Sequence, residues 1–279
     1  MIRGRGILNF EPMKNELLVV GILAGGLLVG GVACKKVVSV ELRDAPSQLV
    51  IEGEVTNGGT PQVKISRSVP YSAANSYPPV SGAVVTVTDS NNGLVAVLKE
   101  STAGVYTTKT YSGVPGHAYR LSVTVGGEVY TASSVMPGQV ALDSITFAMN
   151  TDINNHKDIN AVVNFQDPPG VVNYYQFAES IGGRVIPGVF VFEDRLSDGR
   201  YIEQPLYNDS TYLQRGGDLT LTMNCVDKPV YDYFFTLSGV TGNNGFQTAT
   251  PANPVSNISN GALGYFSAHT TQRVTVEVY

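Results

Sequence analysis

Cys34 is the residue whose position most directly implies a chemical reaction. It follows an apolar run, residues 17–33, that ends in small residues, and a charged stretch precedes this run. These are the features of a secretory signal peptide, and a cysteine at the new N-terminus supplies a thiol for lipid attachment. The sequence therefore predicts that residues 1–33 are a signal peptide, that Cys34 is lipidated and that residues 34–48 form a lipidated tether.

The context of Cys34 resembles the bacterial lipobox, with Gly31 at the position where leucine is commoner. The charged region before the apolar run begins at Met13, which suggests that translation starts there. A transmembrane helix is the alternative, because a run of about 17 apolar residues approaches the lower limit for spanning a bilayer. The glycines from Gly21 to Gly31 favour cleavage instead. Acyl chains on the cysteine would then hold the protein on one membrane leaflet.

Composition restricts the partners and the redox chemistry. The formal net charge is −5, whereas nucleic-acid binding demands a basic patch, so we expect no nucleic-acid partner. Once Cys34 carries lipid, Cys225 is the remaining cysteine, and no disulfide can form within a monomer. Free cysteines are among the most buried residues, so we expect Cys225 to be a buried thiol.

The histidines do not form a recognisable catalytic or metal motif. His117, His156 and His269 lie far apart in the sequence and belong to no His-Glu-x-x-His helix and no Cys/His ligand cluster. The chain also has no Gly-x-Ser-x-Gly elbow and no phosphate-binding Gly-x-x-x-x-Gly-Lys-Ser/Thr loop. We therefore expect no catalytic residue, no bound metal and no cofactor.

Two acidic segments carry oxygen ligands or paired carboxylates at short spacing. Asp152, Asn154 and Asp158 place oxygen ligands two and four residues apart, but their loop lacks the central glycine and terminal glutamate of a calcium-binding EF-hand. A solvated hairpin is the expectation there, and ion binding is left open. Asp194 and Asp198, with the preceding glutamate, could be imagined as a glycosidase pair, although charges flanking a turn are usually solvated.

Tyrosine-rich segments could supply a sugar-stacking surface, since aromatic rings offer both an apolar face and a polar tip. The chain has no tryptophan, and tyrosines in alternating strands more often pack in a core or against a neighbouring strand. We therefore favour a structural role for this set: Tyr174, Tyr175, Tyr201, Tyr207 and Tyr212.

From residue 49 onward the chain is patterned as β-strands. Alternating β-branched segments are separated by turn signals such as Asn57-Gly58 and Gly126-Gly127. The first half of this pattern contains these expected strands: Leu49–Val55, Gln62–Arg67, Ala83–Thr88, Val95–Leu98 and Tyr119–Val125. Met136-Pro137-Gly138 looks like a join, so we expect a β-sandwich domain at residues 49–137 and a second β-domain at residues 138–279.

The second unit is also mostly β, with strands expected at 142–147, 159–165, 172–180, 185–192 and 273–279. One helix is expected between Asp227 and Leu237. Asp227 can cap it, Pro229 lies in the first turn, and apolar residues recur on one face.

Two stretches resemble a known family. The first runs from Leu49 to Thr56, continues through Pro79-Val80-Ser81-Gly82-Ala83 and ends at Gly104-Val105-Tyr106-Thr107. The second runs from Ala252 to Ala268. They resemble the Bacteroidota envelope lipoproteins of domain-of-unknown-function family number 4249. The first is also similar to transthyretin-like, carboxypeptidase-regulatory-like sandwiches.

This resemblance implies a mainly β fold, namely an N-terminal Ig/transthyretin-like β-sandwich followed by a second antiparallel β-domain with one short helix. It implies lipoprotein status and an accessory role beside a TonB-dependent outer-membrane transporter, and it carries over no catalytic residues. Asp143-Ser144-Ile145 and Asp209-Ser210-Thr211 resemble Bacteroidota O-glycosylation sites at Ser144 and Ser210, the second also being an ordinary turn. Lysines rather than acidic residues follow Cys34, so the periplasmic or cell-surface face is undecided.

We therefore expect a lipid-anchored outer-membrane protein with a non-enzymatic binding or assembly role and an unknown ligand. The alternative is an envelope hydrolase that acts on glycan or peptide. That alternative requires two carboxylates, or a cluster that contains histidine, to converge in one cleft.

Overall fold

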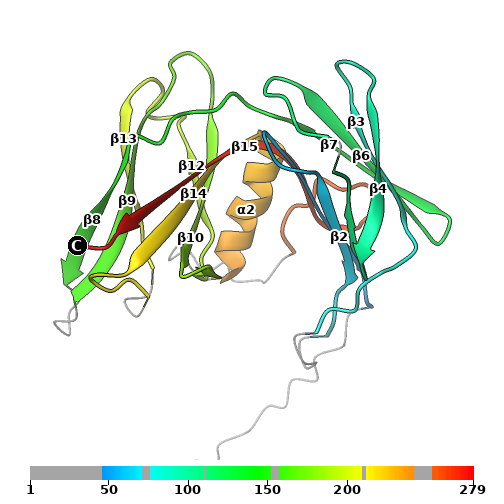
Figure 1. Ribbon diagram of the computed structural model, residues 1–279, viewed down its shortest axis with the longest axis horizontal. Coiled ribbons are helices and arrows are strands. Elements are labelled where there is room, and N and C mark those ends of the chain that lie inside the picture. Colours follow the sequence, from blue (N-terminus) through cyan, green and yellow to red (C-terminus); the bar gives the residue numbers. More distant parts are fainter. Residues whose placement is uncertain (1–45, 71–75, 110, 152–156, 209–211, 242–252) are drawn as a thin grey trace, which may run out of the picture. The chain divides into compact units, whose positions relative to one another are not determined.

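The computed structural model describes residues 46–70, 76–109, 111–151, 157–208, 212–241 and 253–279 (Figure 1). The predicted signal peptide, Cys34 and Ser210 lie outside these residues. The described residues contain no helix that is long and apolar enough to cross a membrane.

The described part of the chain is mainly β, with two sheets and one short helix, as the patterning predicts. The first half contains β1 (Leu49–Thr56), β2 (Gln62–Arg67), β3 (Val84–Asp89), β4 (Val95–Thr102), β5 (Val105–Thr107), β6 (Ala118–Val125) and β7 (Glu128–Val135). The second half contains β8 (Ser144–Thr151), β9 (Lys157–Gln166), β10 (Tyr174–Ile181), β11 (Arg184–Val185), β12 (Phe190–Glu193), β13 (Tyr201–Leu206), β14 (Asp218–Val226), α2 (Lys228–Thr241) and β15 (Leu263–Glu277).

The long strand β15 connects the two halves. The larger sheet has the order β11-β10-β14-β15-β1-β2-β5-β4-β3-β6-β7, and β12 pairs with β10 beside this path. β15 pairs antiparallel with β14 and parallel with β1, so strands from both ends of the chain meet at its centre. The remaining strands form a small sheet of order β13-β9-β8.

Two hydrophobic cores lie along β15. Phe266 and Ala268 belong to the first, with side chains of β1, β2, β3 and β6. Val274 and Val276 pack against the second, with side chains of β9, β10 and β14. All four positions are even-numbered, and alternate residues of a strand face the same side, so one face of β15 contributes to both cores. Residues 45–279 form one compact unit, and the expected division at residues 137 and 138 stays a prediction.

The pairing of β1 with β15 depends on a glycine. Gly264 has a φ of 97°, which residues with a side chain rarely adopt. A Cβ atom there would lie 2.0 Å from the carbonyl oxygen of Ile51, its partner in the register. Glycine therefore permits the close parallel approach of these two strands.

Several local predictions are confirmed. β6 and β7 form the expected hairpin around Gly126-Gly127. The helix begins directly after Asp227, whose Oδ1 accepts a hydrogen bond from the Val230 amide at 3.4 Å. The same carboxylate accepts a hydrogen bond from the Val135 amide through Oδ2 at 2.8 Å, which ties the helix start to the end of β7.

Other boundaries were wrong. The expected strand at 185–192 is broken, because β11 ends at Val185 and β12 begins at Phe190. Pro187 lies between them, and a proline cannot donate to a strand ladder. The expected closing strand at 273–279 is the last part of β15, which begins ten residues earlier at Leu263.

Candidate functional site

The face of the large sheet opposite the two cores carries a groove of about 890 Å³. Its floor comes from four adjacent strands, β10, β14, β15 and β1, and its lining includes Phe234 of α2. The helix α2 packs against β10, β12 and β15 (Figure 1). The groove is therefore positioned by strands from both ends of the chain.

Alternation along each strand explains the polar floor. In β14 the core-facing positions are Leu219, Leu221, Met223 and Cys225. Between them lie the groove-lining residues Thr220, Thr222, Asn224 and Val226. The sequence Leu-Thr-Leu-Thr-Met-Asn-Cys thus separates an apolar face from a polar one.

A buried pair of side chains lies in the middle of β15. Ser267 Oγ and His269 Nδ1 are 2.9 Å apart, and both side chains are buried. Desolvation lowers the pKa of His269 to about 4, while Ser267 acts in the opposite direction. The imidazole is therefore neutral near pH 7 and can donate or accept hydrogen bonds.

Glu54 of β1 is the register neighbour of Ser267. Desolvation within the groove, followed by the nearby Glu52 carboxylate, raises the pKa of Glu54. A hydrogen bond with Tyr265 and the charge of Arg273 act in the opposite direction. An acidic side chain thus lies close to the Ser267–His269 pair on the groove floor.

One hydrogen-bond acceptor on this floor is left unpaired. Asn224 Nδ2 donates to Gln176 Oε1 at 2.6 Å, whereas Asn224 Oδ1 is buried with no partner among the described residues. Arg273 Nε donates to Thr222 Oγ1 at 3.3 Å. Buried polar atoms are normally satisfied, so the Asn224 oxygen can receive a hydrogen bond from a ligand.

Aromatic rings line one end of the groove. Phe234 of α2 and Tyr265 of β15 both contribute to its lining, with ring centroids 4.9 Å apart. The Tyr233 ring lies 5.0 Å from the Tyr265 ring. The groove therefore combines hydrogen-bonding side chains with an aromatic surface.

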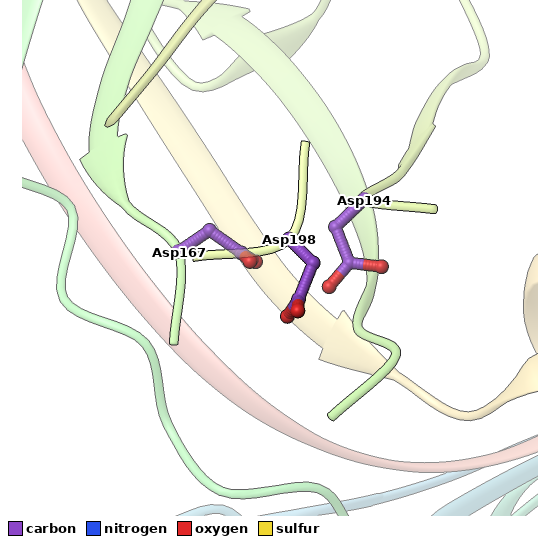
Figure 2. A group of neighbouring side chains, drawn as sticks. All are labelled: Asp167, Asp194 and Asp198. Atoms are coloured by element: carbon purple, nitrogen blue, oxygen red, sulfur yellow. The ribbon is translucent and has the colours of Figure 1, made fainter. Parts of the chain in front are cut away.

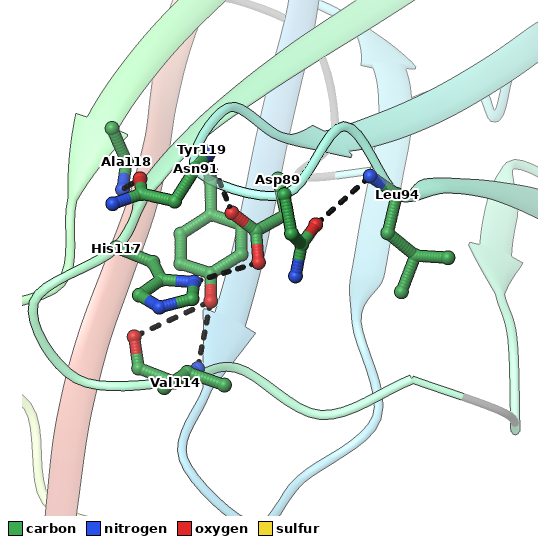
Figure 3. Close-up of polar contacts among 8 residues, drawn as sticks. Asp89, Asn91, Leu94, Val114, His117, Ala118 and Tyr119 are labelled. Carbon is green, nitrogen blue, oxygen red and sulfur yellow. Dashed lines mark hydrogen bonds and ion pairs between the residues drawn. The ribbon is translucent and has the colours of Figure 1, made fainter.

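His117, by contrast, belongs to a network in which each member bonds another (Figure 3). Its Nδ1 lies 2.8 Å from Asp89 Oδ2, and Asp89 Oδ1 accepts a hydrogen bond from the Asn91 amide at 2.9 Å. Tyr119 Oη accepts a hydrogen bond from the Val114 amide at 2.7 Å and is 3.3 Å from the Val114 carbonyl oxygen. These contacts hold the turn after β3 against the loop before β6.

The structure describes some of the predicted site residues and not others. Cys34, Ser210, Asp152, Asn154 and His156 lie outside the described residues. Ser144 is exposed at the start of β8, where a modifying enzyme could reach it. Asp158 is half-buried in β9, and its Oδ1 is buried with no described partner.

Cys225 is buried as expected, and its Sγ accepts a hydrogen bond from the Val140 amide at 3.4 Å. Desolvation raises the pKa of this thiol, which keeps it protonated and unreactive.

The tyrosines divide between the core and the surface. Tyr175 is buried in the second core, and the Tyr174 ring lies 5.1 Å from Tyr231 of α2, in agreement with a structural role. Tyr201, Tyr207 and Tyr212 are exposed and do not pack in the core, so a structural role for them stays a prediction. Tyr201 and Tyr207 line two different cavities.

The main groove was missed from sequence because its residues come from strands that pair over long distances. The alternating threonines of β14 were the available signal. They indicate a polar face, but they do not tell which strands lie beside it.

Comparison with curated proteins finds no match. Among solved structures, a two-domain fibronectin type-III segment of chicken tenascin matches with 12% identity and a TM-score of 0.22, over 65% of this chain and 92% of that one. A family model described as a domain of unknown function (DUF4249) matches residues 35–275. The chain therefore belongs to the DUF4249 family.

Proposed function

We propose that this protein is a lipid-anchored component of the cell envelope that binds a hydroxyl-rich ligand, such as an oligosaccharide, in the groove on its central sheet. The observation that carries the proposal is the polar floor, built by four adjacent strands and containing the unpaired Asn224 oxygen. A binding site needs this combination of concavity and unsatisfied polar atoms.

The geometry of the floor favours hydroxyl groups over a peptide strand. Peptides commonly bind by adding a strand to a sheet edge, where backbone groups are free. The groove lies on a sheet face, which presents side chains: threonine hydroxyls, the amides of Gln176 and Asn224, and the neutral His269. Phe234 and Tyr265 add rings on which a sugar face could stack.

The anchor and the partner rest on the sequence. Lipidation of Cys34 would hold the protein at the outer membrane, and the family resemblance suggests a TonB-dependent transporter beside it. A groove that captures a polar ligand is compatible with delivery to such a transporter.

The rival function is an envelope hydrolase, and one observation favours it. Glu54, Ser267 and His269 all line the same groove, which meets the requirement for a cluster that contains histidine. However, a pKa of about 4 makes His269 a weak general base. We therefore place ligand binding ahead of hydrolysis.

A glycan array tests the proposal, using the detergent-solubilised lipidated protein with Asn224→Ala and Lys99→Ala variants. Lys99 is exposed on β4, far along the sheet order from the groove. Binding by the wild type and by Lys99→Ala, with loss in Asn224→Ala, supports the proposal. Binding to no glycan, or equal binding by all three proteins, contradicts it. Release of shortened glycan that stops in Ser267→Ala would support the hydrolase instead.

The anchor and the partner need their own experiment. Cys34→Ala should move the protein from the membrane to the soluble fraction, and membrane retention without acylation would contradict the anchor. Stoichiometric recovery of a TonB-dependent transporter with the lipidated protein supports the accessory role, whereas recovery of the protein alone argues against it.

A further inference from the structure

Three aspartates converge in the second half of the chain, away from the groove. Asp167 directly follows β9, Asp194 directly follows β12, and Asp198 lies in the turn before β13. One carboxylate oxygen from each lies within 4.8 Å of the other two. Figure 2 shows the three carboxyl groups gathered around a common space.

Two of these carboxylates are fully buried, and Asp198 is exposed. Within the described ranges, no lysine or arginine forms an ion pair with any of the three; Arg195 pairs with Glu193 instead, at 3.6 Å. Neighbouring buried carboxylates without a cation are costly, because each is desolvated and repels the other. Among the described residues, no cationic side chain therefore balances the cluster by an ion pair.

Hydrogen bonds hold two members of the cluster in place. Asp167 accepts hydrogen bonds from the Tyr175 hydroxyl and, through Oδ2, from the Gly199 amide at 3.0 Å. Asp198 Oδ1 accepts one from the Gly170 amide at 2.8 Å. The two turns at 167–173 and 194–200 are thereby fixed around the carboxylates.

Asp194 supplies the observation that points to a ligand. Its Oδ2 accepts hydrogen bonds from the Asn173 amide at 2.9 Å and from Asn173 Nδ2 at 3.3 Å. Its Oδ1 is buried and has no hydrogen-bond partner among the described residues. Figure 2 shows the carboxyl group turned toward the other two aspartates. The carboxyl group of Asp194 is thus turned toward two other carboxylates, and one of its buried oxygens has no hydrogen-bond donor among the described residues.

We infer that Asp167, Asp194 and Asp198 form a calcium site. Oxygen ligands without histidine or cysteine favour hard cations over zinc or copper. Calcium ligands lie at about 2.3–2.6 Å, so oxygens across the ion can be about 5 Å apart, whereas the limit for magnesium is about 4.2 Å. The exposed Asp198 gives the ion a path from solvent.

A proton shared between Asp167 and Asp194 is the competing explanation. It would satisfy the buried oxygen of Asp194 without any ion, but Asp198 would then take no part in satisfying it. The two explanations therefore differ in their response to calcium and to a change at Asp198.

The test is calorimetric titration of the chelator-treated, detergent-solubilised lipidated protein with calcium chloride, extended to several millimolar because extracellular calcium sites bind at about 10⁻⁴–10⁻³ M. We expect one ion per chain, a higher melting temperature in calcium than in chelator, and a weaker response to magnesium. Asp198→Asn should weaken calcium binding at least about ten-fold, since it removes one charged ligand. Asp218→Asn, an exposed change outside the cluster, should bind as the wild type does.

Three results would overturn the inference. One is a wild type that shows no heat of calcium binding and no change of melting temperature in calcium. Another is an equal loss of binding in Asp218→Asn. The third is a calcium-independent protein that Asp194→Asn stabilises, which indicates the shared proton. None of these results bears on the groove, so failure here is distinguishable from failure of the proposed function.

Discussion

The two described histidines have different polar surroundings. His117 pairs with Asp89, and the other oxygen of Asp89 accepts a hydrogen bond from the Asn91 amide. His269 lies in a groove where the buried Asn224 oxygen has no described partner. A satisfied polar network stabilises a fold, whereas an unsatisfied polar surface is prepared for a molecule from outside. We therefore ascribe a structural role to the Asp89–His117 contacts, and the proposed ligand site remains the groove that contains His269.

The largest loss of stability is expected at Gly264 of β15, the strand that contributes to both hydrophobic cores. Gly264→Ala would force a side chain against the Ile51 carbonyl at a φ that disfavours it. We expect a loss of about 4 kcal/mol in the free energy of unfolding, measured with urea, because overpacking and backbone strain combine. Since β15 contributes to both cores, unfolding should remain a single transition. Separate unfolding of one half of the molecule, or unchanged stability in the variant, would contradict the coupling of the two cores through β15.

The groove histidine should make stability depend on pH. His269 has a pKa of about 4 in the folded protein, below its ordinary value. The unfolded chain therefore gains a proton first as the pH falls, so stability drops from about pH 6.5 down to about pH 4. The loss should reach about 3 kcal/mol at 1.36 kcal/mol per pKa unit. His269→Gln should remove this dependence, and an unchanged slope in that variant would contradict a buried neutral imidazole.

The contribution of the Asp89 network to stability should change at a lower pH than that of His269. Asp89→Ala is expected to cost about 2 kcal/mol near pH 7, because it removes the buried carboxylate that accepts the hydrogen bonds of His117 and the Asn91 amide. Desolvation raises the pKa of Asp89, but hydrogen bonds from His117 and the Asn91 and Asn92 amides outweigh it and lower the pKa.

The contribution of Asp89 is therefore complete above its ordinary pKa, near pH 4, and is lost as the pH falls through the lowered value. Urea unfolding of the wild type and Asp89→Asn at several pH values measures it. A stability difference that widens on acidification would show that the carboxylate is not held by these bonds.

The smallest effect on stability is expected in the groove floor. Asn224→Ala removes the bond to Gln176 and also the unpaired oxygen, so the two changes should nearly cancel to within about 0.5 kcal/mol. Unfolding in urea without ligand measures the change. A loss as large as that of Asp89→Ala would place Asn224 among structural residues and weaken the contrast between the regions.

Local features of the fold were predictable from sequence because local interactions decide them. The hairpin at Gly126-Gly127 follows from turn chemistry, and the helix after Asp227 follows from its cap. The burial of Cys225 agrees with the general tendency of free cysteines to be buried. The mainly β fold itself follows from the same alternation.

The groove was not predictable because its floor depends on pairing between distant segments. β1 pairs with β15 at the opposite end of the chain, and Asn57 and Thr271, which share a hydrogen bond, are 214 residues apart in sequence. The burial of Asp194 was missed for a similar reason. Its turn has the composition of a solvated loop, and the Asn173 segment that covers it comes from a different connection.

The most direct test of the central claim is a calorimetric titration of the best glycan-array ligand into the wild type and Asn224→Ala. We predict saturable binding to the wild type and at least about ten-fold weaker binding to the variant, equivalent to about 1.4 kcal/mol, with the same stability in the absence of ligand. Equal affinity in the two proteins would show that the ligand binds elsewhere and that the polar face of the sheet is not the binding site.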